Sequence, residues 1–190
     1  MIRPLFYMLV GIPGSGKTNH ALNLAAAVNG IHLSSDSIRK ELYGDESFQG
    51  DPAEVFALMH SRTLDALDNG RNVIYDATNI TRKDRNSILS KLPKDVDIRC
   101  HIIWAPIETC IERDAARKRT VGKEVIDRML KRFQAPYYDE GIDEIKVVIP
   151  DNFSEYEYTN KIIDMMKIPH DNPHHTLGVF DHCLEAYEYI

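Results

Sequence analysis

The segment GIPGSGKT at residues 11–18 matches the pattern G-x-x-x-x-G-K-S/T at every fixed position, which is typical of a phosphate-binding loop. Glycines allow backbone N–H groups to converge on an anion, because no Cβ stands in the way. Lys17 would reach the β- and γ-phosphates of a nucleoside triphosphate, and Thr18 would offer a hydroxyl to Mg²⁺. A glycine-rich turn without a ligand would need neither side chain. The other loop residues that we expect at the phosphates are Gly11, Pro13, Gly14, Ser15 and Gly16.

A loop of this kind is compatible with a kinase, a GTPase or a motor ATPase. A GTPase would need the guanine-binding sequence Asn-Lys-x-Asp, and the nearest sequence, NKIID at residues 160–164, is one residue too long. In 190 residues there is also little room for the sensor and arginine-finger elements of a motor ATPase. These observations favour a small phosphotransferase.

A second group of candidate residues follows the short apolar segment 31–34. Asp36 and Arg39 are three residues apart at an expected helix start, so both can face one point. A kinase needs a carboxylate that accepts or aligns the acceptor's hydroxyl proton, and a guanidinium can hold a nearby phosphate or carboxylate. The alternative is that Asp36 only caps the helix and Arg39 lies in solvent. Behind a phosphate loop, we expect a catalytic Asp36 and an acceptor-binding Arg39.

A third group, DATN at residues 76–79, ends the apolar segment 72–75. Asp76 occupies the place of a Walker-B acid, where it could hold Mg²⁺ through water. Thr78 and Asn79 would present short polar groups to the acceptor. The alternative is a strand exit that consists of turn-forming residues.

Two arginines, Arg113 and Arg117, are four residues apart in an expected helix over residues 107–119 and would share one face. In a phosphoryl-transfer enzyme, a mobile helix with arginines can close over the phosphates and stabilise the charge of the transition state. The alternative is a solvated basic helix with partners such as Glu112. We expect the pair to form a lid over the nucleotide; the pattern is a poorer guide to Arg119 in the same segment.

Strand-like apolar segments alternate with helical patterns along the chain. This alternation predicts an α/β fold in which helices cover both faces of a parallel sheet. In such sheets ligands lie outside the carboxyl ends of the strands, where these candidate residues fall. At residue 51 the sequence DPAE predicts a helix start, with Asp51 as the cap and Glu54 in a capping box. The expected strands are 5–10, 31–34, 72–75, 98–104 and 145–149, and the expected helices are 17–28, 52–69, 81–92, 107–119, 123–133 and 152–167.

Composition narrows the class of protein further. The chain is 43% hydrophobic and 27% charged, which is typical of a globular protein. Its apolar run 5–10 is far shorter than the roughly 20 residues of a membrane span. The net charge is −6, and residues 151–190 carry eight acidic and two basic residues, which argues against a broad nucleic-acid-coating surface. Cys100, Cys110 and Cys183 show no ligand spacing and predict free thiols in a reducing cytoplasm.

Taken together, these motifs resemble the 5′-hydroxyl polynucleotide kinase branch of the P-loop phosphotransferases. GIPGSGKT, SDSIR, YDATN, ERDAAR and VIDRMLKRFQAPYYDEGIDEI occur in that family's order, over residues 3–150. The resemblance implies a five-stranded, mainly parallel sheet with a helical lid, and the use of ATP with Mg²⁺. It also implies that Lys17 and Thr18 serve ATP and Mg²⁺, that Asp36 is the general base, that Arg39 contacts the acceptor, and that Arg117 with Arg113 contacts the ATP phosphates from the lid.

Near the C-terminus, residues 172–184 resemble the opening of an HD phosphohydrolase domain. In that family a histidine on a helix is the first metal ligand, and His182 matches it. One candidate ligand cannot form a closed metal site, and the family's other ligands come later in the chain. We therefore expect a P-loop kinase domain over 1–168, followed over 169–190 by a linker and the first helix of a truncated HD-like domain.

Three functions agree with these patterns. The leading hypothesis is an ATP-dependent kinase that phosphorylates 5′-hydroxyl ends of RNA or DNA, paired with an HD-type phosphohydrolase in the whole protein for end repair. The second makes the acceptor a small hydroxylated metabolite, because the same motifs occur in kinases of small molecules. The third is a nucleotide-binding regulatory module that controls the HD domain.

Overall fold

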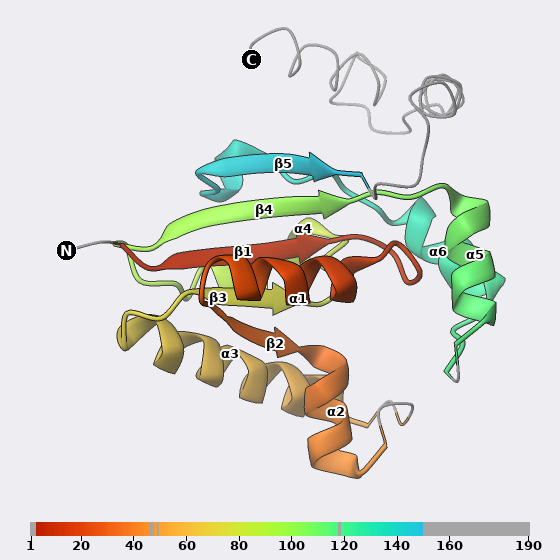
Figure 1. Cartoon of the computed structure of the whole chain (residues 1–190), viewed down its shortest axis with the longest axis horizontal. Coiled ribbons are helices and arrows are strands. Elements are labelled where there is room, and N and C mark those ends of the chain that lie inside the picture. The colour runs from red at the N-terminus through yellow and green to blue at the C-terminus, as the bar shows by residue number, and fades with distance from the viewer. Residues whose placement is uncertain (1–2, 46–47, 49, 118, 150–190) are drawn as a thin grey trace, which may run out of the picture. The chain divides into compact units, whose positions relative to one another are not determined.

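A five-stranded sheet lies at the centre of the computed structural model, which describes residues 3–45, 48, 50–117 and 119–149 (Figure 1). The strands are β1 (Leu5–Val10), β2 (Ile31–Ser34), β3 (Val73–Asp76), β4 (Asp97–Ile103) and β5 (Glu144–Val148). Their order is β2-β3-β1-β4-β5, and all four neighbouring pairs are parallel. This confirms the predicted α/β fold and places the strand of the phosphate loop in the middle of the sheet.

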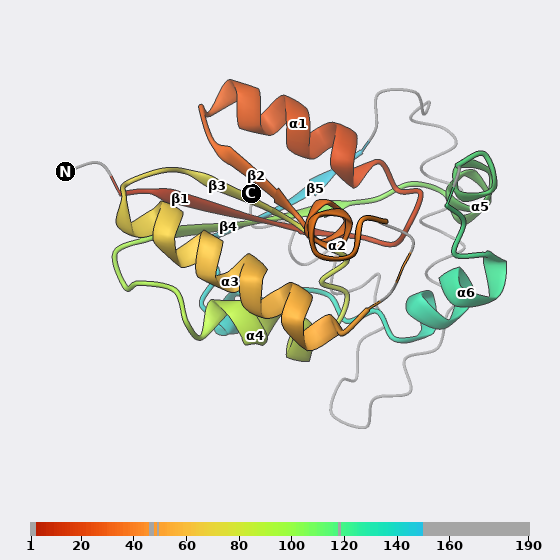
Figure 2. The same cartoon turned by 90° about the horizontal axis from the view of Figure 1, so that it is seen from below.

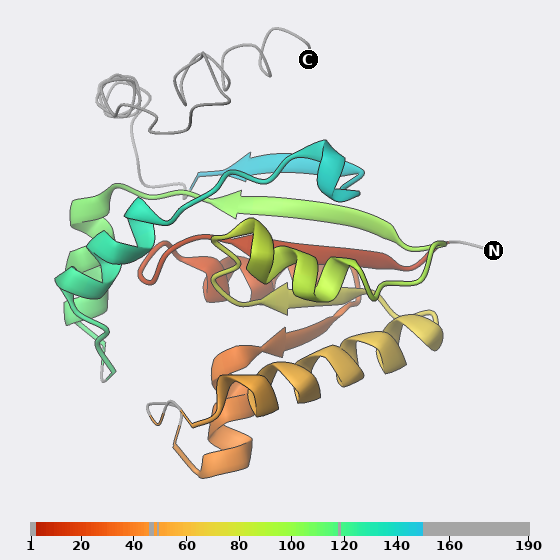
Figure 3. The ribbon, with the colours of Figure 1, turned by 180° about the vertical axis from the view of Figure 1, so that it is seen from behind.

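Helices lie on both faces of this sheet, as the sequence predicts. α1 (Lys17–Ala27) covers one face, whereas α3 (Pro52–Asp68) and α4 (Arg82–Leu89) lie on the other (Figure 2). α2 (Ser35–Tyr43) continues directly from β2, next to α3. α5 (Ile107–Ala115) and α6 (Lys123–Lys131) lie beyond the carboxyl ends of β1 and β4 (Figure 3). The helices at this end are therefore the ones that can reach a ligand of the phosphate loop.

The core is divided between the two faces of β1. Phe6 and Met8 pack into the larger cluster with residues of α3 and α4. Tyr7 and Leu9 pack into a smaller cluster with Ala21 of α1. Because both faces of a parallel sheet are buried, its central strand is apolar at successive positions rather than at alternate ones. The apolar run 5–10 thus places the phosphate loop on a rigid strand.

The start of α3 follows the sequence prediction only in part. Asp51 caps the helix, since its Oδ1 accepts the N–H of Ala53 at 2.8 Å. The predicted capping box with Glu54 is wrong, because the Glu54 carboxylate instead accepts the hydroxyl of Tyr43 at 2.7 Å. That bond joins α2 to α3. A tertiary partner therefore replaces the local one that the four-residue pattern indicated.

Several expectations lie outside the described residues. They are the helix over 152–167, the domain boundary at residue 168, and the linker and HD-like helix over 169–190. Within the part of the chain that the structure describes, no helix is both long and apolar enough to cross a membrane.

Candidate active site

The phosphate loop connects β1 to α1 in a shape that requires glycine. Gly14 and Gly16 have φ values of 81° and 99°, which L side chains rarely adopt. A Cβ on Gly14 would also collide with the backbone carbonyl of Cys110 in α5. The N–H of Gly11 donates to the carbonyl oxygen of Thr78 at 3.0 Å, which joins the loop to the exit of β3. The loop is thus held between two neighbouring elements.

The hydroxyl group of Ser15 shows whether the loop could hold a phosphate. This hydroxyl is fully buried and has no hydrogen-bond partner within the described residues. A buried polar atom without a partner is costly, so an added acceptor such as a phosphate oxygen is expected beside it. The residues present therefore fit a nucleotide phosphate.

Lys17, at the start of α1, lies back across this loop. Its Nζ donates to the carbonyl oxygen of Ile12 at 2.9 Å. Burial lowers the pKa of Lys17 to about 8, against an opposing effect of Asp76, and Arg117 lowers it further. The structure therefore brings Lys17 together with the predicted metal-binding acid and with one predicted lid arginine. Thr18, the next residue, is exposed at the first turn of the helix.

Asp76 ends β3 and is almost completely buried. Its Oδ2 lies 3.0 Å from Nε2 of His32 on β2. Across the described ranges, no three His, Cys, Asp or Glu side chains form a metal-binding group. Magnesium is commonly bound by one or two carboxylates together with substrate phosphates. Asp76 and Thr18 fit that pattern, in which the nucleotide supplies the other ligands.

Asp36 does not cap α2, because the hydroxyl of Ser34 accepts the N–H of Ser37 in that role. The capping alternative for Asp36 is therefore wrong. Its Oδ1 instead accepts from Arg39 Nη1 at 2.7 Å and from Arg119 Nη1 at 3.0 Å. The Asp36 side chain is 55% exposed, whereas that of Arg39 is only 12% exposed. A solvated Arg39 is thus also excluded, and an accessible carboxylate is held by two cations.

The predicted lid arginines do not share a helix face. α5 ends at Ala115, so Arg117 lies in the loop that follows, whereas Arg113 is still helical. A Cβ on Gly16 would lie 3.7 Å from the Arg113 guanidinium, which places this side chain beside the phosphate loop. Arg117 is exposed but close enough to lower the pKa of Lys17. Both arginines therefore lie near the expected phosphates, although on different elements.

Asp114 explains why α5 ends early, and the sequence analysis assigned it no role. This carboxylate is buried and accepts the N–H groups of Val121 and Gly122 at 3.0 and 2.9 Å. These bonds connect the last turn of α5 to the residues just before α6, so the two ends of the α5–α6 loop are held together. The loop that carries Arg117 and Arg119 is thereby fixed at both ends. An aspartate among arginines gives no sequence signal for such a contact.

Asn79 has a structural role that the prediction of an acceptor-binding residue did not include. It is buried at a φ of 49°, and its Nδ2 donates to the carbonyl oxygen of Leu9 at 2.7 Å. The side chain thus attaches the exit of β3 to β1. Thr78 is half-buried at the same exit and holds Gly11 through its carbonyl. Of the two, only Thr78 retains some accessible surface for an acceptor.

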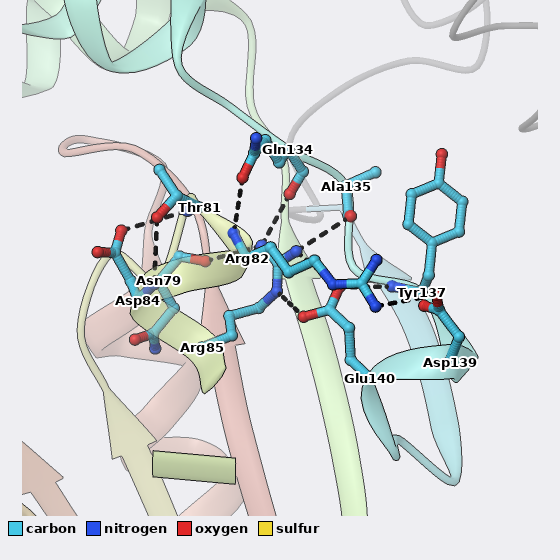
Figure 4. Close-up of polar contacts among 10 residues, drawn as sticks. All are labelled: Asn79, Thr81, Arg82, Asp84, Arg85, Gln134, Ala135, Tyr137, Asp139 and Glu140. Carbon is cyan, nitrogen blue, oxygen red and sulfur yellow. Dashed lines mark hydrogen bonds and ion pairs between the residues drawn. The ribbon is translucent and has the colours of Figure 1, made fainter. Parts of the chain in front are cut away.

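Arg85 is a buried structural residue that the sequence analysis did not indicate (Figure 4). It is fully buried and forms a bidentate ion pair with Glu140 in the short 3₁₀ turn Tyr138–Glu140. Its guanidinium also donates to the carbonyls of Asn79, Gln134 and Ala135 at 3.1, 2.7 and 3.1 Å. The segment after α6 is therefore fixed to the exit of β3, whose Thr78 carbonyl binds the phosphate loop at Gly11.

A profile of the AAA domain family matches residues 6–136, which is more than half of the chain, so the chain belongs to this family. It is 25% identical over 173 residues to the L-seryl-tRNA(Sec) kinase of Methanococcus maripaludis, covering 85% of this chain and 66% of the relative. It is 22% identical over 150 residues to the transcription factor bHLH140 of Arabidopsis thaliana, covering 75% and 16%. The chain thus spans less than two thirds of the length of either relative.

Solved structures have the same fold. A chain of the Pnkp1/Rnl/Hen1 RNA repair complex matches with a TM-score of 0.63 and 23% identity, over 75% of this chain and 47% of that chain. A gluconokinase from Sinorhizobium meliloti matches with a TM-score of 0.55 and 17% identity, over 80% and 86%. The chain therefore has the fold of the P-loop kinases.

Proposed function

We propose that this chain is an ATP-dependent kinase that transfers the γ-phosphate to the 5′-hydroxyl end of RNA or DNA. The observation that carries this proposal is the exposure of the Asp36 carboxylate together with its contacts to two arginines. Its carboxylate is exposed, has no capping role and is held by Arg39 and Arg119. Asp36 follows β2, at the same end of the sheet as the phosphate loop. An accessible carboxylate at this place suits a group that accepts the proton of an acceptor hydroxyl.

In the proposed reaction, the acceptor's hydroxyl oxygen forms a bond to the γ-phosphorus. The bond between that phosphorus and the β–γ bridging oxygen breaks, ADP leaves, and the hydroxyl proton passes to Asp36. Lys17, Arg113 and Arg117 stabilise the charge on the phosphate oxygens, which is the main requirement of phosphoryl transfer. Bound Mg²⁺, held by Thr18 and Asp76, would neutralise part of the same charge.

The relatives support a nucleic-acid acceptor. The matched curated kinase is named for seryl-tRNA, and the structure with the TM-score of 0.63 belongs to an RNA repair complex. The motif order over residues 3–150 also resembles that of 5′-hydroxyl polynucleotide kinases. A small hydroxylated metabolite is the second candidate, because the match to the gluconokinase covers 86% of that chain.

Labelled ATP separates the candidates. We expect the protein to label RNA or DNA oligonucleotides that have a 5′-hydroxyl, and to leave matched 5′-phosphorylated oligonucleotides unlabelled. Labelling of a small hydroxylated metabolite such as gluconate alone would favour the metabolite kinase. Binding of ATP without transfer to any acceptor would favour the regulatory module. Lys17→Ala serves as the inactive control, because its ammonium is directed at the transferred phosphate.

The HD-like partner domain stays a prediction from residues 172–184. We propose that the whole protein pairs the kinase with a metal-dependent phosphohydrolase for end repair. Assay of the full-length protein for release of phosphate from nucleic-acid ends, with and without a chelator, tests this pairing.

A further inference from the structure

Asp76, the buried acid at the end of β3, forms a hydrogen bond with a histidine of the neighbouring strand. Nε2 of His32 on β2 lies 3.0 Å from Oδ2 of Asp76. The bond uses one of the two carboxylate oxygens, so His32 does not engage the other oxygen, Oδ1. The sequence analysis assigned no role to His32, although it lies beside the acid that we expect at Mg²⁺.

The register of the sheet explains how these two side chains meet. His32 lies opposite Ile74 on β3, and Asp76 is two residues further along that strand. Side chains two positions apart on a strand point to the same face of the sheet. Ile74 packs into one cluster with Ala21 of α1, so His32 and Asp76 lie on the face that α1 covers. This is the helix that begins at Lys17, directly after the phosphate loop.

Burial makes the hydrogen bond important for Asp76. The Asp76 side chain is 5% exposed and that of His32 is 17% exposed. A buried carboxylate is costly unless it is paired or hydrogen-bonded. Because an ionised carboxylate can only accept hydrogen bonds, Nε2 of His32 carries the hydrogen that it donates. The imidazole therefore fixes the position of one oxygen of Asp76.

Asp76 also lies close to the groups that would hold the nucleotide. Burial lowers the pKa of Lys17, and Asp76 raises it in opposition. Two residues after Asp76, the carbonyl oxygen of Thr78 accepts the N–H of Gly11 in the phosphate loop. Magnesium requires near-ideal octahedral geometry, so its binding depends on how a ligating carboxylate is oriented. Such carboxylates are commonly oriented by a hydrogen bond from a neighbouring group.

We propose that His32 is a positioning residue for the Mg²⁺ of this site. By holding Oδ2, His32 directs the other oxygen of Asp76, Oδ1, toward the metal that Asp76 and Thr18 would bind. This inference rests on the proposed function and deepens it. In this role His32 touches neither the nucleotide nor the acceptor, and it acts only through Asp76. Loss of its donor should therefore weaken metal binding and leave metal-free nucleotide binding to Lys17 and the phosphate loop unchanged.

Two amide substitutions that differ by one methylene group test this role. His32→Gln retains an N–H donor at about the reach of the histidine Nε2, whereas His32→Asn carries its donor nearer the backbone, too short for Oδ2 of Asp76. We would measure the Kd of ADP by calorimetry, once with excess Mg²⁺ and once with EDTA. The ratio of the two Kd values reports how much the metal contributes to nucleotide binding.

His101→Gln is the matched control. His101 lies opposite Leu9 on the same face of the sheet, but its Nδ1 lies 2.9 Å from Nε2 of His20 and not at Asp76. A general effect of replacing a histidine under α1 should therefore appear in this variant too. An effect on the metal should not.

Mg²⁺ should tighten the binding of ADP to the wild-type protein. His32→Asn should reduce this tightening by roughly 10-fold, the lower end of the effect of removing the partner of a metal ligand. It should leave the Kd in EDTA unchanged. His32→Gln should retain most of the tightening, and His101→Gln should retain all of it. In the Asp76→Asn background, His32→Asn should have no further effect, because the histidine acts through the carboxylate.

Several results would overturn the role of His32. They are a wild-type protein whose Kd of ADP does not depend on Mg²⁺, a His32→Asn variant with the wild-type ratio, a His32→Gln variant that loses as much as His32→Asn, and an equal effect of His32→Asn in the Asp76→Asn background. A Kd that rises equally in Mg²⁺ and in EDTA would show a structural role instead. If His32→Asn does not fold, His32→Leu replaces it as the variant without a donor, and the same outcomes apply.

Failure of the proposed function would be distinguishable, because the binding experiment contains no acceptor. A protein that shows the expected dependence on Mg²⁺ and on His32, but phosphorylates no 5′-hydroxyl oligonucleotide, would overturn the proposed acceptor. It would leave the role of His32 in the nucleotide site intact.

Discussion

Arg85 and Glu140 form an almost completely buried ion pair, although 55 residues separate them in the sequence. Arg85 Nη2 lies 2.7 Å from Oε1 of Glu140, and Nε lies 2.8 Å from Oε2, so the pair is bidentate. One residue lies on α4 and the other just before β5. The pair therefore joins α4 to the 3₁₀ turn that follows α6, and a separate bond from Arg85 to the Asn79 carbonyl connects both to the exit of β3.

We predict that Glu140→Gln lowers the free energy of unfolding by about 3–5 kcal/mol, because a buried guanidinium then lacks its counter-charge. Urea unfolding measures this change. The matched control is Glu41→Gln, which breaks a bidentate but exposed pair with Arg62. An exposed pair should cost only about 0.2–1 kcal/mol. Equal losses in the two variants would contradict a special role for the buried pair.

The sequence could predict the features that depend on local order. Apolar runs bounded by turn-forming residues predicted all five strands, and the spacing of Asp36 and Arg39 predicted that both side chains can face one point. It could not predict the role of Arg85, because four of its five hydrogen bonds go to residues 134–140, about 50 residues further along the chain, and only the fifth goes to the nearby Asn79 carbonyl. Arg119 was weakly indicated for the same reason, since no spacing rule connects it with Asp36.

The end of α5 is a second feature that the sequence alone could not predict. Charge spacing indicated that Arg113 and Arg117 share a helix face, but helix continuation depends on what the backbone can bond to. The side chain of Asp114 bonds to the backbone of Val121 and Gly122, and the chain turns there. Arg113 still lies beside Gly16 from the end of α5, and Arg117 still acts on Lys17 from the loop that follows.

Substitutions of Asp36 and Ser34 should have different effects: the first should lower the rate of phosphoryl transfer, and the second should lower the stability of the protein. Because Ser34 provides the cap, Asp36→Asn should leave the start of α2 intact, and the lost counter-charge of Arg39 and Arg119 should lower the free energy of unfolding by about 1 kcal/mol at most. The same substitution should lower phosphoryl transfer by roughly 10²-fold or more, the scale of a lost general base. Ser34→Ala should instead cost about 1 kcal/mol of stability, the scale of a lost N-cap. Transfer rates and urea midpoints of both variants test this, and a stable, fully active Asp36→Asn protein would remove Asp36 from the mechanism.

His60 should make the protein less stable at acidic pH. It is buried between Tyr75 and Lys91, with Nε2 3.1 Å from the Tyr75 hydroxyl and Nδ1 2.9 Å from the Lys91 ammonium. Burial, together with Lys91, lowers the pKa of His60 to about 4. As the pH falls from 6.5 to 4, the unfolded chain binds a proton that the folded protein does not, so stability decreases by at most about 3 kcal/mol.

Unfolding at pH 7 and pH 4.5 measures this effect. His60→Gln should show a smaller difference between the two values than the wild-type protein. Part of the difference should persist, because burial also lowers the pKa of His101 to about 4. An NMR titration of the folded protein gives an independent check, and a His60 pKa near 6.5 would refute the prediction.

Asp114 should act on catalysis through the loop that it closes. In Asp114→Ala, the N–H groups of Val121 and Gly122 lose their acceptor, and the arginines of the loop lose their fixed position. Misplacing such groups by about 1 Å can cost roughly 10²-fold in rate, so we expect kcat/KM for ATP and for the acceptor to fall together by roughly 10- to 100-fold. Steady-state kinetics with each substrate varied in turn measures both values. The matched control is Asp127→Asn, whose carboxylate pairs with the exposed Lys123 on α6 and should leave both values unchanged. If Asp114→Ala reduced stability but retained wild-type kinetics, the loop would not need this anchor to position its arginines.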